Sequence, residues 1–230
     1  MKNGSGVEAE RLVTWAGTPP AGETFLARTS LRKRGMDLVL ALAVLALSAP
    51  VFLTIYALLK IFDPGPALFS QLRVGRDGRT FTVYKFRTMR VDAAVRLEQM
   101  LAADPLAEAE WAKYQKLRCD PRITVIGRFL RKSSLDELPQ ILNILRGEMS
   151  VIGPRPVTPG EIHRYGADYP FYTAMRPGVL GLWQVRGRNT LTYAQRVAYD
   201  VQYVKTWSIW QDIKILFMAV PVVLFGLGAY

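Results

Sequence analysis

The sequence predicts a mixed α/β protein that is attached to a membrane by one helix near its N-terminus. Three observations support this prediction. Leu38 to Leu59 is a run of 22 residues without a charge. Ala67 to Tyr84 has the strand–turn–strand pattern of a β-hairpin. Segments of helical composition follow between residues 92 and 207 and carry much of the charge.

The composition indicates one compact domain with an anionic partner. Half of the 230 residues are hydrophobic, which is enough for a core and argues against disorder. Thirty basic against nineteen acidic residues give a net charge of +11. A single cysteine (Cys119) and a single histidine (His163) exclude an internal disulfide and a His/Cys metal site. A bound metal would therefore have oxygen ligands, as Mg²⁺ and Mn²⁺ prefer.

We expect four segments along the chain. They are a loosely ordered tail at 1–30, a membrane helix at 31–62, a cytoplasmic domain at 63–214 and an apolar segment at 215–230. The last segment has 16 uncharged residues interrupted by Pro221. At about 24 Å as a helix it is too short to span a bilayer comfortably. It would lie in the membrane interface, pack on the first segment or form a homodimer interface.

The first apolar segment has the length of a membrane helix, about 33 Å against a hydrocarbon thickness of about 30 Å. Pro50 lies near its middle and predicts a kink, because proline removes one helix hydrogen bond. Each flank carries four basic residues, namely Arg28, Arg32, Lys33 and Arg34 before it and Lys60, Arg73, Arg76 and Arg79 after it. Equal flanks place both ends in the cytoplasm, which favours a re-entrant helix broken at Pro50 over a straight spanning helix.

The elements that follow are a hairpin and three helices. The hairpin turns around Asp77-Gly78, and Lys85 and Arg87 follow its second strand. Asp92 to Leu117 predicts two helices separated at Asp104-Pro105. Thr124 to Lys132 predicts a short helix with Ile126, Phe129 and Leu130 on one side and Arg128, Arg131 and Lys132 beside them. Such a helix either lies on anionic lipid or has an ordinary solvated basic face.

The segment SSLDELPQILNILRG predicts a helix whose buried face is Ile141, Leu142 and Leu145 and whose end is Gly147. Its start is open. Ser134 and Glu137 match a capping box, whereas Pro139 favours a start after Leu138. Either start places Asp136 and Glu137 at a helix N-terminus, where negative charge is stabilised.

The two carboxylates have two interpretations. Acidic residues at a helix start are common caps. Alternatively, Asp136 attacks phosphorus while Glu137 binds a divalent cation, and this chemistry requires Mg²⁺ because two carboxylates would otherwise repel a pyrophosphate.

Arginines held near Gly and Pro could bind such a phosphate. Arg155 lies between Pro154 and Pro156, which restrict the backbone and suit a bidentate clamp, although a rigid loop with an exposed arginine has the same pattern. The other candidates are Arg87, Arg176 before a short apolar strand to Trp183, and Arg186 and Arg188 in a basic turn. Asp200, on a helix predicted at Thr192 to Trp207, would bind metal or substrate or pair with an arginine.

The segment SLDELPQILNILRGEMSVIGPRP resembles the bacterial sugar transferases, the small monotopic phosphoglycosyl transferases that prime exopolysaccharide synthesis. KRGMDLVLALAVL, YKFRTM, DPRITVIGRFLR, RPGVLGLWQVRGRN and YDVQYVKTWSIWQDIKIL extend the resemblance over residues 31–218. One departure concerns the helix break, where the family commonly has Ser-Pro and this chain has Ala49-Pro50, with Ser48 one place earlier.

The resemblance implies transfer of a sugar-1-phosphate, most often galactose or glucose, from a UDP-sugar to polyprenyl phosphate with Mg²⁺ and release of UMP. It implies that Asp136 is the nucleophile, that Glu137 is the magnesium ligand, and that Lys85, Arg155 and Asp200 belong to the site. The implied fold is a small α/β catalytic domain on the cytoplasmic face of the bacterial inner membrane, behind a re-entrant helix and interfacial amphipathic helices.

Two other functions fit parts of the sequence. A membrane-tethered basic module would bind nucleic acid or lipid, but no known nucleic-acid-binding pattern is present and no nucleic-acid partner is expected. A phosphotransferase of phospholipid synthesis would need several spanning helices and a denser aspartate motif. Release of UMP that depends on polyprenyl phosphate distinguishes the first function from both.

Overall fold

The structure is a computed structural model that describes residues 30–114, 117, 120–187 and 191–224. It is a mixed helix and strand protein with one long apolar helix, α3 (Leu31–Phe62). In the described part of the chain, α3 alone is long and apolar enough to cross a membrane. Of the predicted tail at 1–30, residues 1–29 lie outside the described residues.

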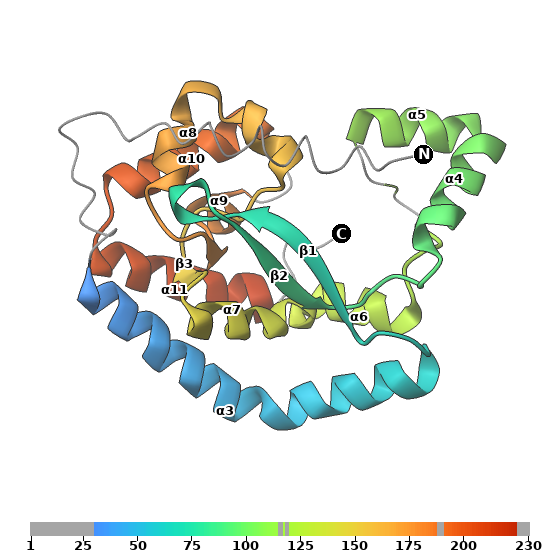
Figure 1. The fold of residues 1–230 in the computed structure, drawn as a ribbon, viewed down its shortest axis with the longest axis horizontal. Helices are drawn as coiled ribbons and strands as arrows, with labels where there is room; N and C mark the ends of the chain where they lie inside the picture. The colour runs from blue at the N-terminus through green and yellow to red at the C-terminus, as the bar shows by residue number, and fades with distance from the viewer. Residues whose placement is uncertain (1–29, 115–116, 118–119, 188–190, 225–230) are drawn as a thin grey trace, which may run out of the picture.

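Helix α3 begins where the Ser30 side chain accepts a hydrogen bond from the Lys33 amide. It continues through Pro50 without interruption. Figure 1 shows α3 bent near its middle, with both ends toward the rest of the molecule. The Thr54 hydroxyl donates to the Pro50 carbonyl at 2.8 Å, whereas the Ser48 hydroxyl has no partner among the described residues. The predicted break is therefore a bend in one helix.

Buried polar contacts fix the N-terminal end of α3 on the domain. The Lys33 ammonium lies 2.7 Å from an Asp212 carboxylate oxygen and 2.9 Å from the Ile152 carbonyl. Asp37 accepts hydrogen bonds from the Ser150 hydroxyl and the Val151 amide. Because these groups are buried, each needs its partner, so the contacts set the position of the helix.

The predicted hairpin is confirmed as β1 (Leu68–Val74) and β2 (Thr80–Phe86), which pair antiparallel from Leu68 opposite Phe86 to Val74 opposite Thr80. The turn η2 (Arg76–Gly78) contains positive φ at Asp77 and Gly78. Lys85 lies within β2 rather than after it. The hairpin crosses the face of the molecule shown in Figure 1.

Three helices follow β2, as predicted. They are α4 (Ala93–Ala103), α5 (Pro105–Tyr114) and α6 (Val125–Ser133). Helix α6 approaches the end of the hairpin so closely that a Cβ on Gly127 would lie 2.0 Å from the Thr88 carbonyl oxygen. Only part of the predicted apolar side of α6 is buried. Leu130 is fully buried, whereas Phe129 is exposed.

The remaining elements form the body of the domain. They are η3 (Leu135–Gln140), α7 (Ile141–Arg146), β3 (Ser150–Ile152), η4 (Pro159–Arg164), η5 (Gly166–Asp168), α8 (Tyr169–Thr173), β4 (Gly178–Leu180), α9 (Leu182–Arg186), α10 (Tyr193–Lys205) and α11 (Ile209–Leu224). Strands β3 and β4 are parallel. The largest core cluster joins α8, α9, α10 and α11 around β3.

Two details differ from the prediction. The buried face of α7 consists of Ile141, Asn143 and Ile144, whereas Leu142 and Leu145 are half-buried. The apolar strand ends at Leu180, and Trp183 lies in helix α9, because Gly181 begins a new helix there.

Candidate active site

The turn between α6 and η3 positions the two acidic residues. Ser134 ends α6 with φ of 57°, a left-handed conformation that costs a non-glycine residue free energy. Its side chain makes no capping hydrogen bond, so the predicted capping box is absent. Pro139 lies inside η3, and α7 begins only at Ile141, so the predicted start after Leu138 is wrong. Asp136 and Glu137 occupy the first turn of η3, so their predicted place at a helix N-terminus is confirmed.

Strand β2 brings Lys85 to both carboxylates. The Lys85 ammonium lies 2.5 Å from a Glu137 oxygen and 3.8 Å from an Asp136 oxygen. All three side chains are largely buried, with exposed fractions of 22% for Lys85, 14% for Asp136 and 18% for Glu137. Leu138 anchors η3 in the cores on either side of it. The sequence prediction that these three residues share a site is consistent with this geometry.

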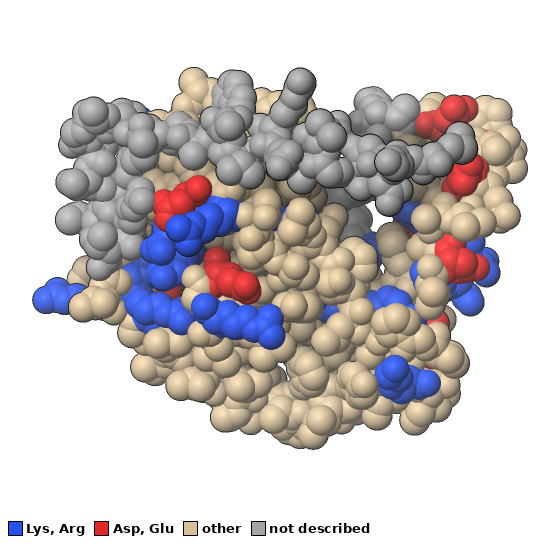
Figure 2. All heavy atoms as spheres, viewed as in Figure 1, with Lys and Arg blue, Asp and Glu red and all other residues tan. Residues whose placement is uncertain are grey.

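Arg155 completes the charged cluster from the other side. Its guanidinium lies 3.6 Å from the same Glu137 oxygen, and it remains 37% exposed. Lys85, Glu137, Arg155 and Pro156 line an open hollow of about 240 Å³. In Figure 2, Lys and Arg side chains gather with a few acidic ones toward the tip of the hairpin. A hollow with this charge can receive an anionic group.

Arg73 also lines this hollow, although the sequence analysis counted it only as a flanking charge. Its guanidinium donates to the Pro156 carbonyl at 3.0 Å and to Gln71 at 2.6 Å. Burial lowers the pKa of Arg73, and the neighbouring positive charge of Arg155 lowers it further. Only the alternation along β1 could have indicated that Arg73 shares a face with this site.

The Asp136 carboxyl lies in an environment that opposes its ionisation. Burial is the main cause that raises its pKa, and the Glu137 charge adds to it, whereas Lys85, Arg131 and Arg155 act in the opposite direction. Arg131 was predicted to lie on a basic helix face that meets either anionic lipid or solvent. Instead it donates from Nε to the Thr88 hydroxyl at 2.9 Å, and burial lowers its pKa although the Asp136 charge opposes this change.

Asp200 is buried and does not line the hollow. It is 2% exposed and accepts a hydrogen bond from the Tyr165 hydroxyl at 2.8 Å. Burial raises the pKa of Asp200 to about 8, with the Tyr165 hydrogen bond and the Arg155 charge opposing the rise. Its other oxygen has no hydrogen-bond partner among the described residues. The predicted pairing of Asp200 with an arginine is therefore electrostatic only.

Three of the other predicted phosphate-binding arginines, Arg87, Arg176 and Arg186, do not join this cluster. Arg87 is buried and pairs with Asp63 at the end of α3. Arg176 donates to the Gly147 carbonyl and lines a different hollow. Arg186 is exposed at the end of α9, and Arg188 lies outside the described residues.

The donor set fits a magnesium ion that takes its remaining ligands from substrate phosphates and water. No group of three or more His, Cys, Asp or Glu residues that could hold a metal is found within the described part of the chain. Asp136 and Glu137 supply two adjacent carboxylates. Mg²⁺ commonly binds one or two carboxylates, with substrate phosphates and water as its other ligands. The two carboxylates fit that mode.

Comparison with known proteins identifies a family and several similar proteins. The family model described as bacterial sugar transferase matches residues 28–226. An undecaprenyl-phosphate galactose phosphotransferase of Salmonella typhimurium is 49% identical over 89% of this chain and 43% of its own length. The exopolysaccharide production protein ExoY of Rhizobium meliloti is 47% identical over 87% of this chain and 88% of its own.

A third relative is named for glucose rather than galactose. The UDP-glucose:undecaprenyl-phosphate glucose-1-phosphate transferase of Caulobacter vibrioides is 41% identical over 92% of this chain and 76% of its own length. The chain spans less than half the length of the first curated relatives that it matches, at 43% and 44%.

Proposed function

Since the chain belongs to the bacterial sugar transferase family, we propose that it transfers galactose-1-phosphate or glucose-1-phosphate from a UDP-sugar to undecaprenyl phosphate. UMP is the second product, and the reaction is the first membrane step of exopolysaccharide synthesis. The observation that carries the proposal is the pair of adjacent carboxylates, Asp136 and Glu137, held by Lys85 and Arg155 beside a basic hollow.

The first step forms a covalent bond to the enzyme. An Asp136 carboxylate oxygen attacks the phosphorus that carries the sugar, and the bond from this phosphorus to the bridging oxygen breaks. The bridging oxygen leaves with UMP and keeps the electron pair. Arg155 and Arg73 line the hollow where the diphosphate charge would lie, and their guanidiniums suit phosphate oxygens. Lys85 stabilises the negative charge near both carboxylates.

The second step passes the sugar phosphate to the acceptor. A phosphate oxygen of undecaprenyl phosphate attacks the same phosphorus, and the bond from phosphorus to the Asp136 oxygen breaks. The carboxylate is regenerated and the product is an undecaprenyl-diphospho-sugar. Division into two displacements lets the soluble donor and the lipid acceptor use the same carboxylate in turn.

Mg²⁺ is part of the proposal, with Glu137 as its protein ligand. When bound, the ion would neutralise the diphosphate and stabilise the departing UMP. Glu137 now contacts Lys85 at 2.5 Å and Arg155 at 3.6 Å, so metal binding would compete with these ion pairs.

The proposed membrane arrangement follows from α3 and α6. Both ends of α3 point toward the domain, as expected for a re-entrant helix whose bend lies within the bilayer. On α6, Val125 is 89% exposed and Phe129 62%, and basic residues stand beside them. We place the domain on the cytoplasmic face of the inner membrane, where the site can reach both substrates.

The test is UMP release by purified protein in nanodiscs that contain undecaprenyl phosphate. A panel of UDP-sugars should give rapid UMP release with UDP-galactose or UDP-glucose and little without the acceptor. Asp136→Asn should abolish this release. Asp92→Asn, a matched change at an exposed residue of the α4 region, should not. Full turnover by Asp136→Asn would contradict the proposal.

A further inference from the structure

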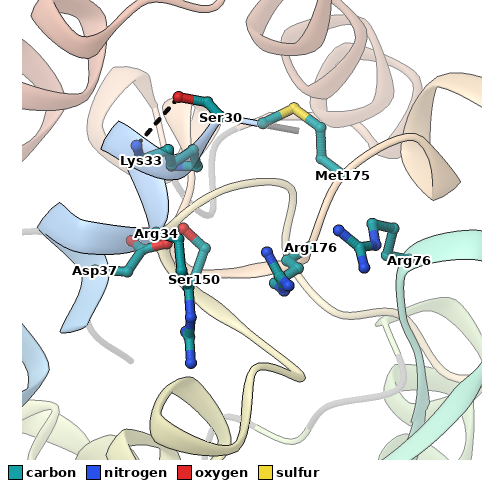
Figure 3. Close-up of a pocket in the computed structure, with 8 residues that line it drawn as sticks. All are labelled: Ser30, Lys33, Arg34, Asp37, Arg76, Ser150, Met175 and Arg176. Atoms are coloured by element: carbon teal, nitrogen blue, oxygen red, sulfur yellow. Dashed lines mark hydrogen bonds between the residues drawn. The ribbon is translucent and has the colours of Figure 1, made fainter. Parts of the chain in front are cut away.

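A second basic cluster lies at the N-terminal end of α3. Arg34, Arg76 and Arg176 come from α3, the hairpin turn and the loop before β4, and they line a common open hollow of about 260 Å³. Figure 3 shows the Arg76 guanidinium directed toward Arg176, with Arg34 on the opposite side of Arg176. This hollow shares no lining residue with the hollow beside Glu137.

The arginines of this cluster are held in place by carbonyl groups. Arg34 donates to the Ile144 and Leu145 carbonyls at 2.7 and 3.0 Å. Arg176 donates from Nε to the Gly147 carbonyl at 2.6 Å. Both therefore interact with the C-terminal end of α7, and among the described residues the two terminal nitrogens of Arg176 have no hydrogen-bond acceptor. Side chains fixed in this way lose little further entropy when they bind an anion.

Positive charge predominates in the cluster, although the carboxylates of Asp37 and Asp77 oppose part of it. Among the described residues, neither Arg34 nor Arg176 has a carboxylate partner, while Arg76 lies 3.4 Å from Asp77. Asp37, which also lines the hollow, is buried and accepts from Ser150 and Val151. Burial lowers the pKa of Arg176, and the charges of Arg76 and Arg34 lower it further. An anion between them would relieve this repulsion.

The place of the cluster suggests the source of the anion. Arg34 lies in the first turn of α3, and Val39 and Leu42, one to two turns further along the helix, are exposed apolar residues. The rise from residue 34 to residue 39 is about 7.5 Å in a helix. Basic residues at this distance from an apolar membrane surface lie at the level of lipid headgroups.

We infer that Arg34, Arg76 and Arg176 form a phosphate-binding site that holds the headgroup of an anionic phospholipid at the entry of α3. The site would bind the phosphodiester of the headgroup through Arg76 and the terminal nitrogens of Arg176. It would thereby hold the hairpin tip and α7 against the membrane. This inference does not depend on the proposed transfer reaction.

The test measures lipid binding and not turnover. Full-length protein in detergent is titrated with phosphatidylglycerol or phosphatidylcholine, and bound lipid is counted by native mass spectrometry. The wild type should prefer phosphatidylglycerol. Arg76→Gln and Arg176→Gln should each weaken phosphatidylglycerol binding about tenfold, since each removes a charge-assisted hydrogen bond. Arg79→Gln removes the same charge from an exposed residue outside the hollow and should leave the preference intact.

A second arm tests a soluble source of phosphate. Phosphorus NMR follows the binding of inorganic phosphate to the wild type and to the Arg76 and Arg176 variants. Binding of inorganic phosphate that both substitutions abolish, without a lipid preference, would overturn the lipid as the source. Equal lipid preference in all four proteins would overturn the site itself. Arg76→Gln alone keeps the inference testable if Arg176→Gln, which loses the contact to Gly147, fails to fold.

Discussion

Replacing Lys85 by Met should lower the transfer rate and change its pH dependence. The Lys85 ammonium lies 3.8 Å from Asp136, and both side chains are largely buried. At an effective dielectric constant of about 20, this attraction is about 4 kcal/mol. Because about 1.4 kcal/mol corresponds to a factor of ten in rate, we expect kcat/KM to fall about 10²- to 10³-fold. The upper limit applies if Arg155 and Arg131 do not compensate.

The direction of the pH effect follows from the pKa of Asp136. The carboxyl must be ionised to attack, burial raises its pKa, and Lys85 opposes the rise. Loss of Lys85 therefore raises this pKa further, and the acidic limb of the kcat/KM profile should move to higher pH. Lys85→Arg keeps the charge and should keep the limb near its original position. An acidic limb that stays in place or moves to lower pH in Lys85→Met would refute this reasoning.

Four further predictions follow from the structure. Arg73→Gln should raise KM for the UDP-sugar about tenfold in steady-state assays, because one charge-assisted contact to the diphosphate is lost; an unchanged KM would exclude Arg73 from the donor site. Gly127→Ala should lower the free energy of unfolding by about 2 kcal/mol or more in thermal unfolding, because the new Cβ would lie 2.0 Å from the Thr88 carbonyl. Lys33→Met should cost about 3 to 5 kcal/mol by leaving Asp212 buried without its cation. The double variant with Asp212→Leu should recover part of that stability, and no recovery would argue against a direct pair. Chelation by EDTA should abolish UMP release, and Mg²⁺ should restore it; full activity in EDTA would exclude the metal.

The local elements were predictable because their signals are local. The apolar run of Leu38 to Leu59, the Asp77-Gly78 turn and the amphipathic pattern of Thr124 to Lys132 each lie in one continuous segment, and all three produced the expected element. The start of the helix at Asp136 was not predictable in the same way. Two short-range rules, the capping box and the N-terminal proline, pointed to different starts. The helical segment begins at Leu135 with Ser134 at its N-cap, which is the start that the Ser134 and Glu137 pattern predicted. It begins as the 3₁₀ helix η3, packed on β2 and without the capping hydrogen bond.

The sequence predicted the central residues of the site but not all of the residues around them. Asp136, Glu137, Lys85 and Arg155 come together, and each lies in a motif that the sequence displays. Arg131 and Arg73 were missed as site residues because only tertiary packing places them there. Three arginines were predicted as site residues from the sequence pattern alone, and the structure places them elsewhere. Arg87 and Arg176 satisfy backbone carbonyls elsewhere, and Arg186 lies exposed at the end of a helix.

The central claim is that the Asp136 side chain carries the sugar phosphate between the two substrates. Intact-protein mass spectrometry after incubation with UDP-sugar, without acceptor, measures this most directly. We predict a mass increase of one hexose phosphate that disappears on later addition of undecaprenyl phosphate and is absent from Asp136→Asn. An unmodified protein at every quench time, while the same preparation forms product when acceptor is present, would contradict the account.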